Sequence, residues 1–251
     1  MTKKNVVAVV TDKSGKKHYI PDLWDVKRKR CSYSNDKTGL PSVNQLPGDI
    51  NHLYDGSIPT ALKEYFPLCS GTCHGDCPGC YAKKVTRNFE PFIKWAMNTI
   101  EAKTDPERFW HLVEKELYGN PIVIYRVVRI HDGGDFFNKD YFETGVNMIK
   151  RHMDTTSFGS YTKEADIVLG YGIDNLPSNF ILSCSPWEGF CEPIGDLPQF
   201  IYDDGTNPEL AALPHCPAVA KNGKRTGVQC KDCLHCYKAK RGDRWCVYAH
   251  K

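Results

Sequence analysis

The spacing of the cysteines constrains this chain more than any other feature. Twelve cysteines occur among 251 residues, and seven of them have another cysteine after or before an interval of only two or three residues. The N-terminus shows no signal-peptide pattern, and no apolar stretch approaches the roughly 20 residues needed to span a bilayer. We therefore expect a cytoplasmic protein without a membrane partner, in which clustered thiols bind metal rather than form disulfides.

The first cluster reads Cys73-His-Gly-Asp-Cys77-Pro-Gly-Cys80, which is the spacing C-x3-C-x2-C. Three thiolates in one loop can bind three irons of a [4Fe-4S] cluster and leave the fourth iron open to a substrate. Zinc is the alternative metal, with Cys69 as the fourth tetrahedral ligand. We favour iron-sulfur, because zinc ligands usually come as separated pairs.

The second cluster lies near the C-terminus and consists of Cys230, Cys233 and Cys236, with the spacing C-x2-C-x2-C. Cys216, which precedes a proline, is the predicted fourth ligand, and Cys246 is equally well placed. This set predicts a second [4Fe-4S] cluster, with zinc as the alternative. The two cysteine groups can also share one site, so the chain is expected to hold one or two clusters.

Composition adds little about partners. The 33 basic and 30 acidic residues give a formal net charge of +3, so charge does not indicate nucleic-acid binding. The short basic run from Lys27 to Arg30 is interpreted as the solvated face of a loop.

Alternating strand and helix patterns predict the fold class. Two amphipathic helices and a third capped by Asn138 alternate with β-rich runs. The strongest run, Ile122–Ile130, is typical of a strand buried on both faces. The sequence therefore predicts an α/β protein with an incomplete barrel-like parallel sheet and a cysteine-rich, metal-binding C-terminal tail. We expect three parts, which are an N-terminal hairpin with an irregular covering segment (1–68), an α/β core with the first cysteine cluster (69–202), and the cysteine-rich segment (203–251).

A short glycine motif follows the strongest predicted strand. Gly133-Gly134-Asp135 is a plain turn if taken alone, but functional groups in parallel α/β proteins gather at the carboxyl ends of strands. Together with C-x3-C-x2-C, the motif resembles the radical S-adenosylmethionine enzymes, in which Gly-Gly-Glu holds the amino group of the methionine moiety. The resemblance implies that Gly133, Gly134 and Asp135 bind S-adenosylmethionine, although Asp shortens the reach by one methylene.

A closer resemblance appears when the motifs are read with their flanks. The runs 77–82, 129–137 and 161–163, Tyr141, the C-terminal cysteine cluster and the final Ala249-His250 resemble the gene product 88 family of tailed bacteriophages and related mobile elements. This resemblance implies a phage or prophage origin, a location in the bacterial host cytoplasm and a cysteine-ligated metal centre.

These observations predict a small phage-encoded enzyme that resembles radical S-adenosylmethionine enzymes. It would reductively cleave S-adenosylmethionine, with electrons from a reductant such as ferredoxin or flavodoxin, and act on a substrate that the sequence does not identify. No catalytic side chain is assigned. The alternative is a non-enzymatic iron-sulfur or zinc-binding protein, acting as a redox sensor or an interaction module.

Overall fold

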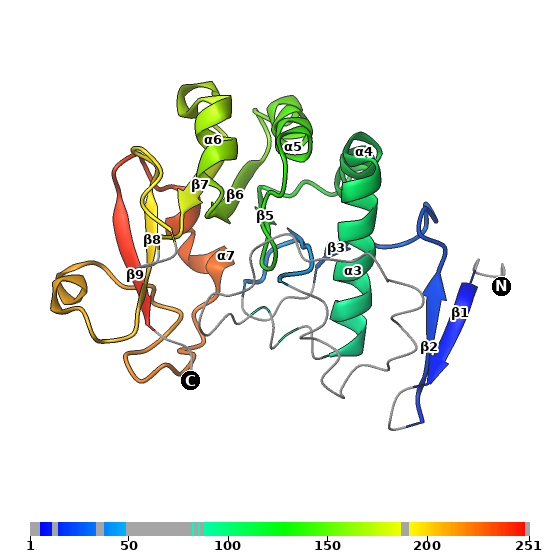
Figure 1. Ribbon diagram of the computed structural model, residues 1–251, viewed down its shortest axis with the longest axis horizontal. Helices are drawn as coiled ribbons and strands as arrows, with labels where there is room; N and C mark the ends of the chain where they lie inside the picture. The colour runs from blue at the N-terminus through cyan, green and yellow to red at the C-terminus, as the bar shows by residue number, and fades with distance from the viewer. Residues whose placement is uncertain are drawn as a thin grey trace.

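The central feature of the fold is a seven-stranded sheet whose strands lie side by side in chain order (Figure 1). The computed structural model describes residues 6–11, 15–33, 38–48, 82, 85, 88–186 and 191–248. The first two strands of the sheet pair antiparallel, and every later pair is parallel. The strands are β3 (Cys31–Ser32), β4 (Ser42–Val43), β5 (Val127–Ile130), β6 (Ser157–Thr162), β7 (Phe180–Cys184), β8 (Gln199–Asp203) and β9 (Arg244–Tyr248).

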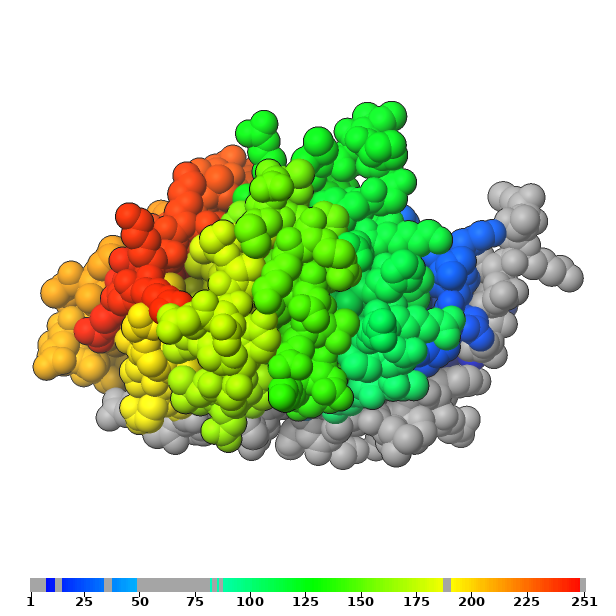
Figure 2. All heavy atoms as spheres, turned by 90° about the horizontal axis from the view of Figure 1, so that it is seen from above, coloured from blue at the N-terminus to red at the C-terminus, as the bar shows by residue number. Residues whose placement is uncertain are grey.

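The sequential order places successive crossover helices on one side of the sheet. Right-handed connections between neighbouring parallel strands that never reverse direction return each helix to the same face. Figure 1 shows this row, which consists of α4 (Pro106–Tyr118), α5 (Lys139–Arg151) and α6 (Ala165–Tyr171). In Figure 2 the colours from yellow through green to blue-green follow one another along the molecule, as this winding requires. The opposite face, called the inner face below, is left for other segments to cover.

The sheet confirms the predicted α/β class and its parallel character, but it is not a closed barrel. Within the described residues β3 and β9 form the two ends of the sheet order and do not pair with each other.

The helices form where their apolar faces and caps predict. Asn138 caps α5 by accepting a hydrogen bond from Tyr141 N, and Asp105 caps α4 by accepting one from Arg108 N. Their apolar faces pack on the sheet in one continuous core, which includes Phe109, Trp110, Val128, Tyr141, Phe142, Val146, Phe158 and Leu182. Burial of this set, at about 25 cal/mol per Å² of apolar surface, is the main force that holds the helices to the sheet.

A second, smaller core joins the N-terminal hairpin to α3 (Phe89–Thr104). The strands β1 (Val6–Thr11) and β2 (Lys17–Pro21) pair antiparallel, which confirms the predicted hairpin. Ala8 and Ile20 pack against Phe92 and Trp95 of the helix. The helix thus lies between the hairpin and the sheet.

The predicted strand Ile122–Ile130 is wrong over its first half, because β5 begins only at Val127. The chain leaves α4 through a turn in which Asn120 accepts hydrogen bonds from Ile122 N and Val123 N. Ile122 is 89% exposed and Ile124 is 66% exposed, so a β-rich composition here does not produce a buried strand.

The C-terminal part supplies regular structure that its sequence did not indicate. Both β8 and β9 belong to the main sheet, and Trp245 is fully buried in it. Between them lie the short helices η3 (Pro208–Ala212), α7 (Cys230–Cys233) and η4 (His235–Tyr237).

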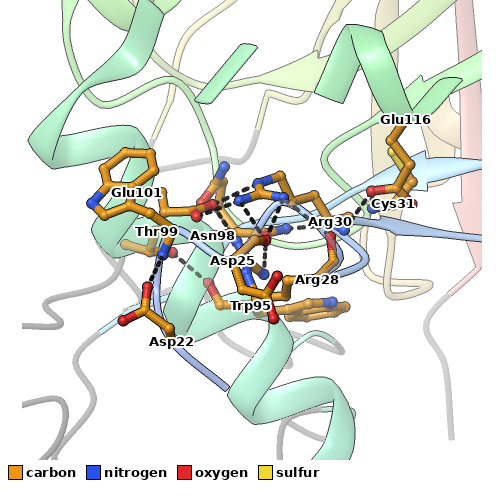
Figure 3. Close-up of polar contacts among 12 residues, drawn as sticks. Asp22, Asp25, Arg28, Arg30, Cys31, Trp95, Asn98, Thr99, Glu101 and Glu116 are labelled. Atoms are coloured by element: carbon orange, nitrogen blue, oxygen red, sulfur yellow. Dashed lines mark hydrogen bonds and ion pairs between the residues drawn. The ribbon is translucent and has the colours of Figure 1, made fainter. Parts of the chain in front are cut away.

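Two residues of the basic run are buried, which contradicts its interpretation as a solvated loop face. Arg30 is 1% exposed and forms a bidentate pair with Glu101 of α3, with Nε–Oε2 at 2.9 Å and Nη2–Oε1 at 2.7 Å. Arg28 contacts the same carboxylate, and Asn98 accepts a hydrogen bond from Arg28 (Figure 3). Of the four residues only Lys27 and Lys29 are exposed, and a turn in which Arg28 N donates to Asp25 O at 3.0 Å directs the chain here.

Among the described helices, no stretch is long and apolar enough to cross a bilayer.

Candidate functional site

The loop that follows β5 carries the Gly133-Gly134-Asp135 motif at the carboxyl edge of the sheet. His131 and Gly134 adopt left-handed backbone conformations, with φ of 62° and 81°, so the chain turns sharply here. His131 N donates to Val43 O at 2.8 Å, and Gln45 N donates to Gly133 O at 3.0 Å. The loop is therefore fixed to the end of β4.

Gly133 has no room for a side chain. A Cβ at this position would lie 2.5 to 3.1 Å from three atoms of the Trp95 ring. The glycine allows the strand-end loop to approach α3 closely, which is one reason why this position has no side chain.

Asp135 is buried and connects the ends of two strands. Its Oδ1 accepts a hydrogen bond from Phe136 N at 2.8 Å, and its Oδ2 accepts one from Lys163 N, just beyond β6, at 2.8 Å. Burial raises the pKa of this carboxyl to about 6, although these hydrogen bonds and one from Thr162 favour the charged form. A ligand amine would have to share carboxylate oxygens that already hold the fold together.

The residues before the glycines form a second polar group. Arg129 Nε lies 2.6 Å from Asp132 Oδ1, and His131 Nε2 lies 3.0 Å from the Tyr141 hydroxyl. Burial lowers the pKa of His131 to about 3, and the nearby Arg129 charge acts in the same direction. His131 is therefore neutral at pH 7, and its Nδ1 has no hydrogen-bond partner among the described residues.

The inner face of the sheet carries a row of aromatic and polar side chains. Arg129 lies over the Tyr161 ring at 5.0 Å, Tyr161 contacts Phe200 at 4.7 Å, and Phe200 contacts Trp245 at 5.7 Å. By strand alternation Ser183 faces the same side, because Leu182 and Cys184 belong to the core under the helices. Within the described part of the chain, Ser183 Oγ and Trp245 Nε1 are buried without a partner, and buried polar atoms normally have one.

The cysteine-rich segment packs on this inner face. Tyr237 of η4 lies directly on Gly159 of β6, where a Cβ would meet its ring at 2.4 Å. The adjacent Cys236 thiol hydrogen-bonds Tyr161, and His235 packs edge-on against Trp245 at 5.2 Å. The segment therefore packs against the sheet of the α/β part.

Two of the predicted tail ligands, Cys216 and Cys230, lie near a third, Cys236. The pKa of the Cys236 thiol is raised to about 11, chiefly by burial and also by the nearby Cys216 and Cys230, against a hydrogen bond with Tyr161. Leu234, between Cys233 and Cys236, has a φ of 55°, a strained conformation of the kind found in ligand-binding loops. The Cys246 thiol contacts Leu210 O at 3.9 Å, and the Cys246 carbonyl accepts a hydrogen bond from Cys216 N at 2.7 Å.

The donor chemistry of the tail fits a metal, because thiolates are ligands of both zinc and iron-sulfur clusters. Among the described residues, no group of three or more His, Cys, Asp or Glu side chains is gathered closely enough to hold a metal ion.

The first cysteine cluster, Cys73, Cys77 and Cys80, and also Cys69, lie outside the described residues. Cys184 and Cys191, which are not among the predicted ligands, meet at the end of β7 near Lys163. Sequence reasoning missed Ser183 and Trp245 on the inner face. Their shared face depends on strand register, which spacing along the chain does not reveal.

The fold and the site define an α/β protein whose singly wound parallel sheet carries a cysteine-rich segment over its inner face. The chain belongs to the gene product 88 family, since the family model Gene product 88 matches residues 24–240. Comparison with curated proteins and with solved structures gives no significant match.

Proposed function

We propose that this protein is a phage-type iron-sulfur protein that resembles radical S-adenosylmethionine enzymes and reductively cleaves S-adenosylmethionine to act on a substrate still to be identified. The observation that carries the proposal is the winding of the sheet. Strands in chain order with helices on one side leave an inner face and a carboxyl edge where a cofactor can lie. Gly133-Gly134-Asp135 lies at that edge, and the tail cysteines pack over that face.

Each part of the chain would have a defined role. Cys73, Cys77 and Cys80 would hold the catalytic cluster, and Cys216, Cys230, Cys233 and Cys236 a second one. When bound, a reduced cluster supplies the electron that cleaves S-adenosylmethionine to a deoxyadenosyl radical. The protein itself would orient the methionine group with the backbone of Gly133 and Gly134 and the carboxylate of Asp135, and would exclude water with the aromatic row of the inner face.

The test is anaerobic incubation with S-adenosylmethionine and dithionite, measuring 5′-deoxyadenosine and methionine. We expect both products in equal amounts, and neither from a Cys77→Ala variant. Asp135→Asn should keep its iron but raise the KM for S-adenosylmethionine at least about tenfold, because hydrogen bonds to charged groups contribute about 1.5–3 kcal/mol. Asp174→Asn, at a side chain that is 90% exposed, serves as the control.

One observation favours a second candidate, a non-enzymatic metal-binding protein that acts as a redox sensor or an interaction module. Both oxygens of Asp135 already accept backbone hydrogen bonds, as a residue with a structural role would. Under this alternative the protein contains metal but releases no deoxyadenosine, and Asp135→Asn affects stability alone.

A further inference from the structure

Two cysteines outside both predicted clusters meet at the end of β7. Cys184 is the last residue of that strand and is fully buried, and Cys191 is partly exposed. Their thiols hydrogen-bond each other. Both sulfurs also lie near one carbonyl oxygen, that of Glu192, at 3.6 Å from Cys184 Sγ and 3.3 Å from Cys191 Sγ. The two side chains therefore converge on one point at the carboxyl edge of the sheet.

The surroundings of the two thiols are unequal. The hydrogen bond from Cys184 lowers the pKa of Cys191, and Lys163 at the end of β6 lowers it further, against burial and the charges of Asp135 and Glu192. The same hydrogen bond, together with burial, raises the pKa of Cys184. The accessible sulfur is thus the better thiolate, and the buried sulfur keeps its proton and donates it to the first. Thiol–disulfide exchange needs this division between an attacking and a resolving thiol.

We propose that Cys184 and Cys191 form a thiol–disulfide exchange site that reduces a low-molecular-weight disulfide. The Cys191 thiolate attacks one sulfur of the disulfide, which forms a mixed disulfide and releases one thiolate. Cys184 then loses its proton and attacks the Cys191 sulfur, which releases the second thiolate and leaves a Cys184–Cys191 disulfide. Two electrons pass from the protein dithiol to the small disulfide, and an external dithiol resets the site.

The proposal does not depend on metal in the tail or on S-adenosylmethionine cleavage. No tail cysteine is among the groups that shift the pKa of Cys184 or Cys191.

The experiment exposes the reduced full-length protein to oxidised glutathione under anaerobic conditions, blocks the remaining thiols and digests the chain with a glutamate-specific protease. Cleavage after Glu164, Glu188 and Glu209 gives the fragments 165–188 and 189–209, each with one cysteine of the pair. We expect mass spectrometry to find these two fragments joined, and to find them separate after reduction. Fragments that stay separate at every ratio of oxidised to reduced glutathione would overturn the proposal.

Single variants assign the two roles. Cys184→Ser should accumulate glutathione on fragment 189–209, and Cys191→Ser should leave fragment 165–188 unmodified. Cys31→Ser, which removes a buried thiol elsewhere, should join the fragments as the wild type does. If a variant does not fold, a short pulse of iodoacetamide on the wild type still shows which cysteine is the attacking thiol. Cys191 should react at least about tenfold faster than Cys184. Equal or reversed rates contradict the assignment.

Discussion

At the scale of single residues, burial decides which charges matter. The run of four basic residues does not indicate that Arg28 and Arg30 are buried against α3. Their shared partner in that helix, Glu101, lies 71 positions after Arg30. Burial lowers the pKa of Arg28 to about 10, even though Glu101 counteracts this shift. Sequence patterns reveal a residue type and its spacing, but a partner this distant becomes visible only in the folded chain (Figure 3).

Glu101→Gln should lower the free energy of unfolding by about 3–5 kcal/mol, because it leaves two buried guanidinium groups without their carboxylate. The measurement is urea unfolding followed by circular dichroism. Glu90→Gln, on the same helix, is the matched control: its exposed pair with Lys16 should contribute less than about 1 kcal/mol. Equal losses for the two variants would contradict the assigned role of the buried cluster.

Asp135 predicts a pH dependence of stability. Its pKa in the folded protein is raised from the ordinary value of 3.8 to about 6, so the folded chain holds this proton more tightly than the unfolded chain. The contribution of this bound proton to the free energy of unfolding is fully present below pH 3.8 and is lost as the pH rises through about 6. It amounts to about 3 kcal/mol at most.

The free energy of unfolding of the wild type is compared with that of Asp135→Asn across pH 4–7, because the difference removes the contributions that other carboxyl groups make to both proteins. The stability of the wild type relative to this variant should fall as the pH rises through that interval. A difference that stays constant with pH would show that Asp135 titrates normally.

At the scale of elements, local signals predicted the three longest helices, but they missed α6 and predicted only part of the strands. Asp105 and Asn138 mark helix starts by hydrogen bonds that form within three residues, and such signals can be found in the sequence. The ends of β5, and the existence of β8 and β9, depend on pairing with distant strands. Ile122 and Ile124 are β-branched but exposed, because pairing, and not composition, decides where a strand begins.

Gly159→Ala tests the packing of the cysteine-rich segment on the sheet. A methyl group would collide with the Tyr237 ring, so we expect a loss of about 1–3 kcal/mol and faster proteolysis within residues 204–243. Gly170→Ala is the control, because nothing lies within 4 Å of its added methyl group and it lies within α6. That variant should be neutral or slightly more stable. Unchanged proteolysis in Gly159→Ala would mean that the segment is not held by this contact.

At the scale of the whole molecule, the fold brings together three features that lie far apart in the sequence. The singly wound sheet provides an inner face, the loop after β5 brings Gly133-Gly134-Asp135 to its edge, and the cysteine-rich segment packs over it. The sequence predicted the α/β class and the motifs, since these follow from periodicity and spacing. It did not predict that the tail would join the sheet, because parallel pairing between β8 and β9 spans some forty residues.

The proposed function requires that the cysteines of this protein hold iron-sulfur clusters, and metal analysis of the anaerobically purified protein tests this most directly. We predict a brown protein with iron and acid-labile sulfide in equal amounts, about four of each per cluster. Replacement of Cys73, Cys77 and Cys80 by alanine should remove one cluster, and replacement of Cys230, Cys233 and Cys236 should remove the other. A colourless protein that contains zinc and no sulfide would contradict the account.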